Sequence, residues 1–380
     1  MNKNTKLLFW HKLLYDVYFY GAIIVPFFVS KSYDIQTAIS LAAIYMVVSI
    51  LVELPTGIIG DRYGHKLSIV AGVFLTGLAL AGFVVSSDIL FDALGIILLA
   101  VGSALVSGSD VALLRNVSDN YERDNRTFDY LKSIMLLVSF GSAGFIVELV
   151  DFNYAVILSS IIAFISILPL FFMSKKSTNK GTDTYISFKD QVRDLPKSLK
   201  KVDGGIAIVL FGGMVAAVLF SVKEIVSSLS PVYELDITLV GIVAGLAMGA
   251  RILGTYIEKK ALVSSKILLV WFIATVTLSA LVNYSLLVGV FFLLASSALA
   301  QMLFYKLKYQ LSSEAPQVHV ASLVSGLTLA GRLTSGGVIF LSGALVGLGY
   351  FHVTFVIVGI ILATFGSFLL SKISAASLIE

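Results

Sequence analysis

A few ionisable side chains lie inside long apolar stretches of this sequence, and they are the first candidates for chemistry. Asp16 lies about ten residues into the run from Leu7 to Val29, and Asp110 lies near the end of a later run. An ionisable side chain at bilayer depth costs roughly 2.5–3.5 kcal/mol, so it usually faces a cavity or a partner. We expect Asp16 to bind a proton or a cation, the alternative being a structural hydrogen bond between helices. Asp110 could bind protons or substrate, or it could pair locally near the inner gate.

Two arginines, one glutamate and one aromatic ring complete this set of candidates. Arg332 lies near the middle of its apolar run, and a buried arginine must find an acid or a substrate anion. It could therefore neutralise Glu53 or Asp16 in one conformation and release that acid in another. Arg251 could do the same from the inner side, while Glu53 itself is suited to gate packing. Tyr20, close to Asp16, offers an aromatic face to an amphipathic or cationic substrate.

Three further charges lie toward the outer ends of apolar runs, and several kinds of chemistry are excluded. Glu148, Lys223 and Glu224 can reach the membrane interface, so we treat them as outer-gate candidates. The four histidines are scattered and cysteine is absent, so we expect no metal site and no thiol chemistry. The sequence has no phosphate-binding glycine loop of the nucleotide-binding type. We therefore expect no cofactor, with a proton gradient as the energy source.

The composition indicates that helices in a membrane must position these side chains. Of the 380 residues, 58% are hydrophobic and only 13% are charged. A soluble domain carries about 25% charged residues, so most of the exterior must face lipid. This excludes soluble enzymes, nucleic-acid binders and secreted disulfide scaffolds. Because a membrane-spanning helix takes about 20 residues, the length allows about twelve of them.

Twelve apolar segments are long enough to be such helices. They lie at about 7–30, 37–60, 66–87, 90–114, 128–150, 153–173, 204–230, 237–257, 266–283, 286–305, 318–343 and 349–371. The first one contains Asp16, and no small-residue cleavage site follows it. We therefore expect it to be a retained helix rather than a signal peptide.

A polar, basic stretch at 174–203 divides these segments into two sets of six. We expect an N-terminal six-helix bundle at 1–173, a cytoplasmic linker at 174–203 and a C-terminal bundle at 204–380. The linker could contain an amphipathic helix over about 187–201 or be a solvated tether. Lys and Arg concentrate on the side of the N-terminus, which predicts cytoplasmic termini. We expect a multi-pass protein of the plasma membrane.

The turn after the second apolar segment carries the most specific motif. It reads Gly57-Ile-Ile-Gly60-Asp61-Arg62-Tyr-Gly64-His65-Lys66. We expect Gly57 and Gly60 to permit the close approach of the eleventh helix, because small residues allow tight helix packing in membranes. Gly64 permits a left-handed turn between two helices. Asp61 is suited to a helix N-terminus, where unpaired N–H groups favour an anion.

This motif resembles the loop signature of the major facilitator superfamily, and the arrangement of six plus six helices resembles that family's fold. The preceding segment Glu53–Gly57 is similar to that of bacterial efflux-type, drug/proton antiporter-like members. The resemblance implies an all-α fold of two bundles related by a pseudo-two-fold axis, with a midplane site. It also implies that Asp61 caps the eleventh helix and helps to close the cytoplasmic side. A degraded copy ends the eighth helix, with Thr255 where Asp61 stands in the first.

The chain departs from the family pattern at several positions. His65 stands where the family loop usually has arginine, and Arg115 lies where efflux relatives often have an acid. The arginine associated with proton coupling in the fourth helix is absent. The antiporter signature of the fifth helix is represented by Gly141-Ser-Ala-Gly144, without its proline. These departures weaken the support for antiport and leave the prediction of the fold unchanged.

The residues and the resemblance together predict a secondary transporter rather than an enzyme. We expect proton-coupled efflux of a small amphipathic molecule by alternating access. Uptake of a small metabolite anion, bound by Arg332 or Arg251, is one alternative, and a lipid flippase on the same fold is another. We expect the partners to be the substrate and membrane lipids, without nucleic acid, and the protein to be a monomer.

Overall fold

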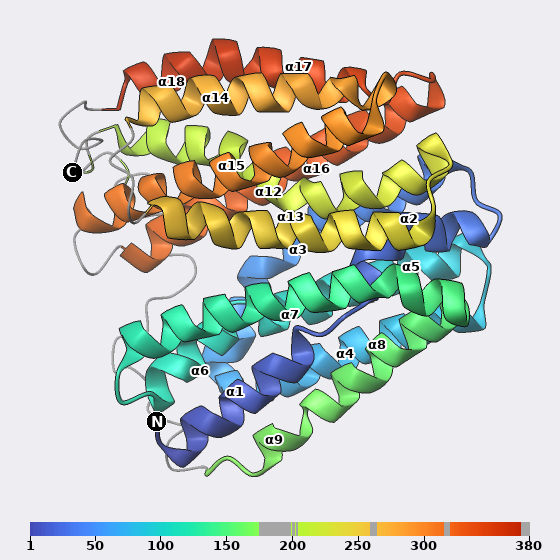
Figure 1. The fold of residues 1–380 in the computed structure, drawn as a ribbon. Coiled ribbons are helices and arrows are strands. Elements are labelled where there is room, and N and C mark those ends of the chain that lie inside the picture. Colours follow the sequence, from blue (N-terminus) through green and yellow to red (C-terminus); the bar gives the residue numbers. More distant parts are fainter. Residues whose placement is uncertain (175–198, 200–201, 203, 259–263, 315–319, 374–380) are drawn as a thin grey trace. The chain divides into compact units, whose positions relative to one another are not determined.

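The secondary structure of the computed structural model is helical throughout its described part (Figure 1). That part comprises residues 1–174, 199, 202, 204–258, 264–314 and 320–373, without the side chains of residues 54, 61, 122, 312–314 and 320–325. Twelve helical segments in it are long and apolar enough to cross a membrane, as the sequence predicts. The chain is therefore an all-α, multi-pass membrane protein. The predicted amphipathic helix at about 187–201 lies outside the described residues, apart from residue 199.

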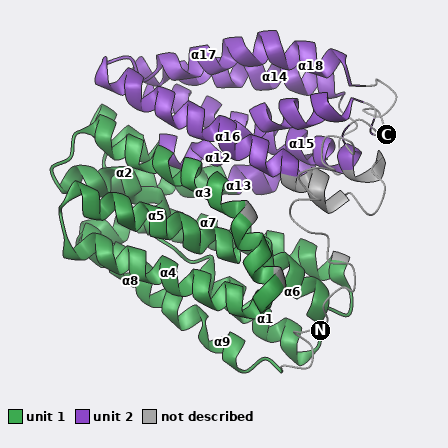
Figure 2. Cartoon of the chain, turned by 180° about the vertical axis from the view of Figure 1, so that it is seen from behind, with its two compact units in different colours: residues 1–185, 226–248 green, residues 186–225, 249–380 purple. Residues whose placement is uncertain are grey.

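The chain forms two compact units, the first made of residues 1–185 and 226–248 (Figure 2). Its helices are α1 (Lys3–Tyr15), α2 (Tyr20–Ser30), α3 (Ile35–Tyr63), α4 (His65–Val85), α5 (Ile89–Val106), α6 (Ser109–Val117), α7 (Tyr121–Leu149), α8 (Phe152–Ser166) and α9 (Leu168–Phe171). The end of α12 (Gly205–Tyr233) and the first half of α13 (Ile237–Glu258) also belong to it. The predicted bundle boundaries stay a prediction.

The second unit is made of residues 186–225 and 249–380. It contains the rest of α12 and α13, then α14 (Ser265–Leu278), a 3₁₀ segment (Ser279–Asn283), α15 (Leu286–Glu314), α16 (Val320–Gly347), α17 (Val353–Ile361), a π segment (Leu362–Gly366) and α18 (Ser367–Ser371). Its core is apolar and includes Phe211, Phe272 and Leu303, which are almost fully buried.

Three of the predicted spans are interrupted, which corrects the expectation of continuous helices there. In the sixth, Phe152–Phe171, Ile167 separates α8 from α9, and the other two are the spans that contain Asp16 and Asp110. The first span, Lys3–Ser30, consists of α1 and α2 separated at residues 16–19. The fourth span, Ile89–Val117, consists of α5 and α6 separated at Ser107 and Gly108. Broken helices expose backbone N–H and C=O groups at membrane depth, where they need partners inside the protein.

Glycines set the closest helix packing in the first unit. A Cβ on Gly72 of α4 would lie 2.5 Å from the backbone oxygen of Gly102 on α5, so both backbones need glycine there. A Cβ on Gly60 would lie 2.7 Å from Ser109 Oγ, which places the start of α6 against this end of α3. Around Gly57, no atom of the described residues lies within 4 Å of such a Cβ. A close contact with α6 therefore forms at Gly60, while the predicted approach of the eleventh helix at Gly57 and Gly60 stays a prediction.

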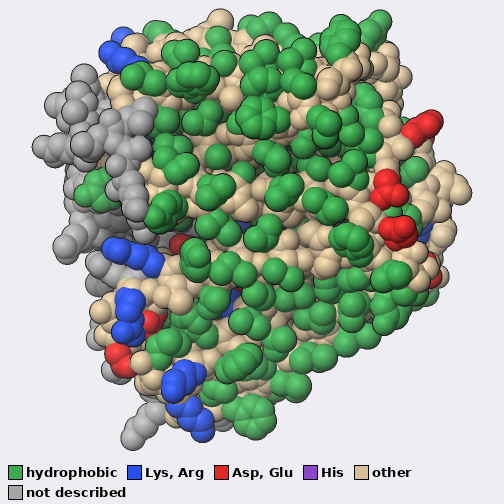
Figure 3. Space-filling view, viewed as in Figure 1, with side chains coloured by type: hydrophobic (Ala, Val, Ile, Leu, Met, Phe, Trp, Pro, Cys, Tyr) green, Lys and Arg blue, Asp and Glu red, His purple; other side chains and the backbone are tan. Residues whose placement is uncertain are grey.

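Large hydrophobic side chains cover the surface where lipid would lie. Leu51, Phe171 and Leu287 are more than 60% exposed, and many other aliphatic and aromatic residues are exposed with them. On the face in Figure 3, Lys and Arg side chains gather near the left edge and several acidic side chains near the right edge. Hydrophobic side chains fill the area between the two edges. This distribution is the one expected of a membrane-embedded surface with charged ends.

Candidate functional site

The break in the first span places Asp16 at the end of α1. Asp16 is the C-cap residue, and its backbone N–H donates to Lys12 O at 3.0 Å. The helix resumes at Tyr20, and the N–H groups of Phe19 and Tyr20 donate to Ser159 Oγ on α8, at 3.0 and 3.4 Å. Ser159 thus satisfies backbone donors that the break exposes. The side chain of Asp16 therefore projects from a helix end and not from a continuous helix face.

The break in the fourth span places Asp110 at the start of α6. Gly108 has a φ of +78°, a left-handed conformation that glycine adopts without strain. Ser107 Oγ in the break donates to Glu53 Oε1 on α3 at 3.1 Å. Asp110 lies in the first turn of α6, and its Oδ1 accepts from the N–H of Val111 at 2.8 Å. An acid in the first turn is favoured by the helix dipole.

These two helix ends bring one lysine and two carboxylates together in the interior of the first unit. Lys12 Nζ donates to Asp110 Oδ2 at 2.7 Å and lies 3.7 Å from Asp16 Oδ1. The three side chains are only 4–12% exposed. Asp16 Oδ2 is buried and has no hydrogen-bond partner among the described residues. The arrangement has one ammonium for two carboxylates, so it can take up one proton or one further cation.

Histidine and aromatic side chains surround this cluster. His11 is fully buried, its Nδ1 lies 2.7 Å from Ser166 O, and its ring stacks on Tyr15. Because a carbonyl oxygen can only accept, Nδ1 carries the proton in this contact. On the other side of the break, the rings of Tyr18 and Tyr20 are 5.1 Å apart, and Tyr18 meets Phe140 of α7 edge to face at 5.4 Å. Tyr20 thus belongs to an aromatic group with Tyr18, and its role toward a substrate stays a prediction.

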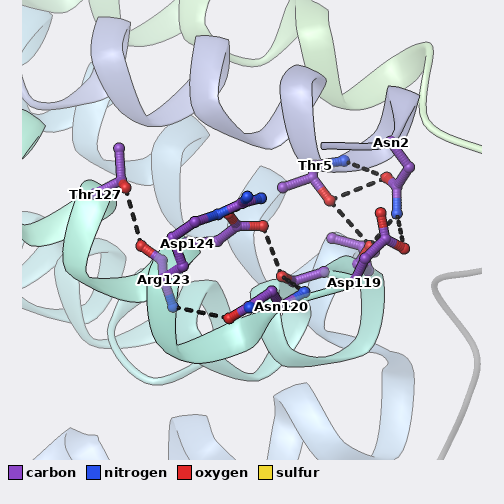
Figure 4. Close-up of polar contacts among 9 residues, drawn as sticks. Asn2, Thr5, Asp119, Asn120, Arg123, Asp124 and Thr127 are labelled. Carbon is purple, nitrogen blue, oxygen red and sulfur yellow. Dashed lines mark hydrogen bonds and ion pairs between the residues drawn. The ribbon is translucent and has the colours of Figure 1, made fainter.

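A polar network at the start of α1 fixes this helix to the end of α6 (Figure 4). Asn2 Nδ2 donates to Val117 O at 2.6 Å and to Asp119 Oδ1 at 3.0 Å. Thr5 Oγ1 also donates to Val117 O, at 2.9 Å. Since Lys12 and Asp110 join the same two helices at their other ends, α1 and α6 are tied at both ends. They form a pair of half-helices that carries the charged cluster.

Sequence reasoning missed Lys12 and Lys132. Lys12 precedes Asp16 by four residues, which is the spacing of ion-paired neighbours on a helix, and this signal was available. Lys132 on α7 is exposed, and it interacts electrostatically with Lys12, Asp16, Asp110 and Asp129. The sequence gives no sign of this, because α7 lies far along the chain from α1.

A second buried ion pair, at the opposite end of the first unit, was also missed. Lys31 Nζ lies 2.6 Å from Asp92 Oδ2 and donates to Phe83 O at 2.7 Å. Asp92 is fully buried and also accepts from Tyr33 Oη at 2.8 Å. Burial and this contact raise the pKa of Tyr33 above its usual value. Each polar group here has a partner, so the pair joins α2 to α5 and leaves no binding position.

The remaining charged candidates lie on other helices. Arg251 on α13 donates from Nε to Gln301 Oε1 at 3.3 Å in the second unit. Lys223 Nζ and Glu224 Oε1 on α12 form an ion pair at 2.7 Å, with Glu224 almost fully buried. In the first unit, Glu148 accepts a hydrogen bond from Thr238. Arg332 lies on α16. Their predicted transport and gate roles stay predictions.

The turn motif has the local geometry that its residues predict. Gly64 separates α3 from α4 with a φ of +97°, so a left-handed residue does join the two helices. His65 begins α4, and Lys66 Nζ donates to Met173 O at 3.3 Å. The guanidinium of Arg62 lies 5.5 Å from the ring of Tyr63. The side chain of Asp61 lies outside the described residues, so its predicted capping of the eleventh helix is untested.

Two curated proteins resemble parts of this chain. It is 27% identical over 121 residues to the uncharacterized MFS-type transporter YxaM of Bacillus subtilis (strain 168), a match that covers 32% of this chain and 30% of YxaM. It is 32% identical over 153 residues to an uncharacterized transporter of Buchnera aphidicola subsp. Schizaphis graminum (strain Sg), covering 37% of this chain and 36% of that protein. The matched segments thus span about a third of each relative.

Solved transporter structures share the fold over almost the whole chain. The crystal structure of the nucleoside transporter NupG aligns with a TM-score of 0.73 at 12% identity, covering 98% of this chain and 99% of NupG. The crystal structure of a D-xylose-proton symporter aligns with a TM-score of 0.74 at 14% identity, covering 98% of both chains. At such identities the likeness concerns the fold alone.

A family model provides the assignment that partial matches and fold similarity do not. The model described as Major Facilitator Superfamily matches residues 13–377, which include most of both compact units and the whole broken fourth span. It agrees with the twelve membrane-spanning segments and with the turn motif around Gly64. The chain belongs to the Major Facilitator Superfamily and is a transporter, not an enzyme.

Proposed function

We propose that the protein is a proton-coupled exporter of small amphipathic molecules and that Asp16 binds the coupled proton. The difference between the distances from Lys12 to Asp110 and to Asp16 supports this proposal most directly. Its ammonium group is bonded to Asp110 at 2.7 Å and lies 3.7 Å from Asp16, whose Oδ2 has no hydrogen-bond partner among the described residues. A buried carboxylate oxygen without a partner is costly while it is charged, and a bound proton removes that cost.

The same three residues supply a way to couple the proton to a conformational change. With both acids ionised, Lys12, Asp16 and Asp110 carry a net charge of −1, and one proton makes the group neutral. While Asp16 is protonated, Lys12 stays with Asp110. When the proton leaves, Asp16 competes for the ammonium group. We propose that these two arrangements favour different access states, because a protein shifts toward the state in which a bound proton is more stable.

The export direction is proposed from the resemblance of the segment Glu53–Lys66 to efflux-type members of the family. A membrane potential that is negative inside favours proton entry by about 2.3 kcal/mol per charge for each 100 mV. Proton entry through Asp16 could therefore drive a substrate outward. In this proposal, Asp61 helps to close the cytoplasmic side, as the resemblance implies.

The substrate class is proposed from the aromatic group beside the charges. Tyr18 lies in the break that follows Asp16 and Tyr20 begins the next helix, and their rings lie 5.1 Å apart. Aromatic rings bind flat apolar bodies through their large contact area and their quadrupole. A small molecule with an aromatic body and one polar group would use both parts of the site.

Proton flux in proteoliposomes tests the proposal and does not require the substrate to be identified first. The full chain is reconstituted with an internal pH-sensitive dye, and gradients of benzyltrimethylammonium, benzenesulfonate or benzyl alcohol are imposed in turn. We expect at least one compound to drive proton movement in the wild type and none in Asp16→Asn. Asp88→Asn is the matched control, because Asp88 caps the exposed start of α5 and asparagine caps equally well.

Each outcome of that experiment bears on the proposal. Proton coupling that survives in Asp16→Asn would remove Asp16 from the mechanism. Accumulation of the active compound in right-side-out vesicles under an inward proton gradient would contradict export and favour uptake. Failure of all three compounds, together with scrambling of labelled lipids, would replace the proposal with lipid flipping.

A further inference from the structure

His11 is a buried, titratable residue to which the proposed proton cycle gives no role. It lies on α1, eight residues after Lys3, where the first span begins, which is about 12 Å along the helix. Its side chain is fully buried, and its Nε2 atom has no hydrogen-bond partner among the described residues. A buried ring nitrogen without a partner can accept a hydrogen bond or a proton.

The other nitrogen of His11 has a structural role at the break in the sixth span. In a continuous helix, the N–H of Leu170 would donate to Ser166 O, but it donates to Ile167 O at 3.0 Å. His11 Nδ1 lies 2.7 Å from Ser166 O and donates to it instead. Because Nδ1 carries the proton, Nε2 has the free lone pair and is the basic atom of the ring. The bond to Ser166 needs a single donor, so it does not account for the second nitrogen.

Tyr15 places His11 beside the charged cluster formed by Lys12, Asp16 and Asp110. The rings of His11 and Tyr15 stack with their centroids 5.8 Å apart. Lys12 Nζ lies 5.9 Å from the centroid of the same Tyr15 ring and is bonded to Asp110. Asp16 follows Tyr15 directly in the chain. Contacts along α1 therefore hold the imidazole ring next to the cluster.

The cluster has an excess of one negative charge for a proton to neutralise. Lys12 is the cation that lies within 4 Å of both Asp16 and Asp110. Lys12 and Asp110 also act electrostatically on His11, from α1 and α6. A proton on Nε2 would make His11 a cation and balance the excess, as a proton on Asp16 does. Such a counter-charge is what a buried imidazolium needs.

The other helices that pack against α1 do not change this balance. They are α7, α8 and α9. Helix α8 carries no charged residue and one tyrosine, Tyr154, and α9 carries no ionisable residue. On α7, Asp129 and Lys132 act on Asp16, and their charges cancel. The excess of one negative charge therefore remains.

We propose that His11 Nε2 is a second proton-binding position, which shares the coupled proton with Asp16. This rests on the proposed function only in that a proton neutralises the cluster. When the Nε2 lone pair accepts the proton, imidazole becomes imidazolium and Asp16 stays a carboxylate. His11 precedes Asp16 by five residues, about 7.5 Å along α1 toward the end that we expect in the cytoplasm. It thus lies on the exit side for a proton that enters through Asp16.

Nitrogen-15 NMR of the full chain in lipid vesicles tests this position without a substrate. The four histidines are labelled, and the His11 signals are those present in every single variant of the other three, His65→Gln, His319→Gln and His352→Gln. We expect His11 to be the neutral Nδ1–H tautomer at about pH 8 and at least about a quarter imidazolium at about pH 5. A histidine with only the structural role would stay neutral at both values.

Two variants connect this titration to the cluster. At about pH 5, Asp16→Asn should contain at least threefold less His11 imidazolium than the wild type, because the negative excess is gone. Asp88→Asn is the matched control and should equal the wild type, since Asp88 caps the exposed start of α5. In the proton-flux assay, His11→Asn should slow proton movement at least tenfold, although its amide can still donate to Ser166 O.

The outcomes separate this inference from the proposed proton cycle. If His11 stays neutral at about pH 5, or if its imidazolium fraction is equal in Asp16→Asn and the wild type, the second position is overturned. Wild-type proton flux in His11→Asn would also overturn it. In these cases, loss of coupling in Asp16→Asn would leave the proposed function standing with Asp16 alone. If His11 titrates as expected while Asp16→Asn still couples protons, proton binding at Asp16 fails and the position at His11 stands.

Discussion

At the scale of single residues, the sharing of Lys12 between two acids is the main electrostatic feature of this protein. Asp110 holds the ammonium group at 2.7 Å, and Asp16 lies a further ångström away. A buried ion pair contributes little net stability, because desolvation offsets most of the attraction. Removing only one partner destabilises the protein, because it leaves a buried charge without a counter-charge.

Substituting Lys12 alone should therefore lower the free energy of unfolding more than substituting Lys12 and Asp110 together. We expect Lys12→Met to lower the free energy of unfolding by about 3–5 kcal/mol, because two buried carboxylates lose their cation. Lys12→Met combined with Asp110→Leu should recover most of that loss while remaining inactive in proton-coupled transport. Unfolding in detergent measures both effects, with Lys6→Met as the control. A double variant no more stable than Lys12→Met would show that the two residues do not act as a pair.

Asp34 provides a pH-dependent contribution outside the membrane-spanning segments. It caps α3, its Oδ1 accepts from Thr37 N at 2.8 Å and its Oδ2 from Thr37 Oγ1 at 2.7 Å, and these bonds lower its pKa. The stability that they contribute is therefore present above the unfolded pKa of about 3.9 and is lost as the pH falls through the folded pKa. Asp34→Asn keeps a helix cap but has no carboxyl group to titrate. We therefore expect this variant to lose less free energy of unfolding than the wild type between about pH 5 and pH 2. Unfolding curves of the two proteins at matched pH test this, and identical pH profiles would contradict it.

At the scale of elements, the two broken spans position the charges, and the sequence did not predict either break. Hydropathy averaged over a span hides four irregular residues when the flanking residues are apolar. In the fourth span, the sequence Ser107-Gly108-Ser109-Asp110 contains a helix stop followed by a helix start, and this was a usable signal. In the first span, residues 16–19 include no glycine or proline, so the break depends on a tertiary partner, Ser159.

Removing that partner should destabilise the break in the first span. Ser159→Ala leaves the N–H groups of Phe19 and Tyr20 without their acceptor, and we expect a loss of about 1–2 kcal/mol, as for a helix N-cap. The control is Ser142→Ala, because Ser142 bonds only to carbonyl groups of its own helix α7. Thermal unfolding and amide exchange at Phe19 and Tyr20 measure the difference. Equal stability of the two variants would show that another group satisfies these donors.

At the scale of the whole molecule, composition and spacing predicted most of the architecture. Twelve spans were expected and are found, and most of their ends agree within about five residues; the larger differences are at Glu53, Leu311 and Gly326. The site was predicted less completely. Asp16 and Asp110 stood out as acids in apolar runs, whereas Lys132 and the Lys31–Asp92 pair depend on contacts between helices distant in sequence. Periodicity within one helix carries no information about such contacts.

The absence of cysteine in the sequence allows a direct test of the predicted orientation. Single cysteines introduced by Lys3→Cys and Ser87→Cys lie at opposite ends of the first unit, and both positions are exposed. We expect a membrane-impermeant maleimide to label intact cells carrying Ser87→Cys and to label Lys3→Cys only after permeabilisation, because basic segments stay in the cytoplasm. The unsubstituted chain is the blank. The reverse labelling pattern would invert the topology.

The four-residue spacing of Lys12 and Asp16 also has a consequence for biosynthesis. When the first span enters the bilayer, Asp110 has not yet been synthesised, and Lys12 has only Asp16 to neutralise it. The two charges can therefore insert as a pair and avoid part of the cost of about 2.5–3.5 kcal/mol that each would bear alone. When the fourth span arrives, Asp110 takes the closer position at 2.7 Å and leaves Asp16 at 3.7 Å. Once the fourth span is in place, Asp16 is therefore the acid that lies farther from the ammonium group of Lys12.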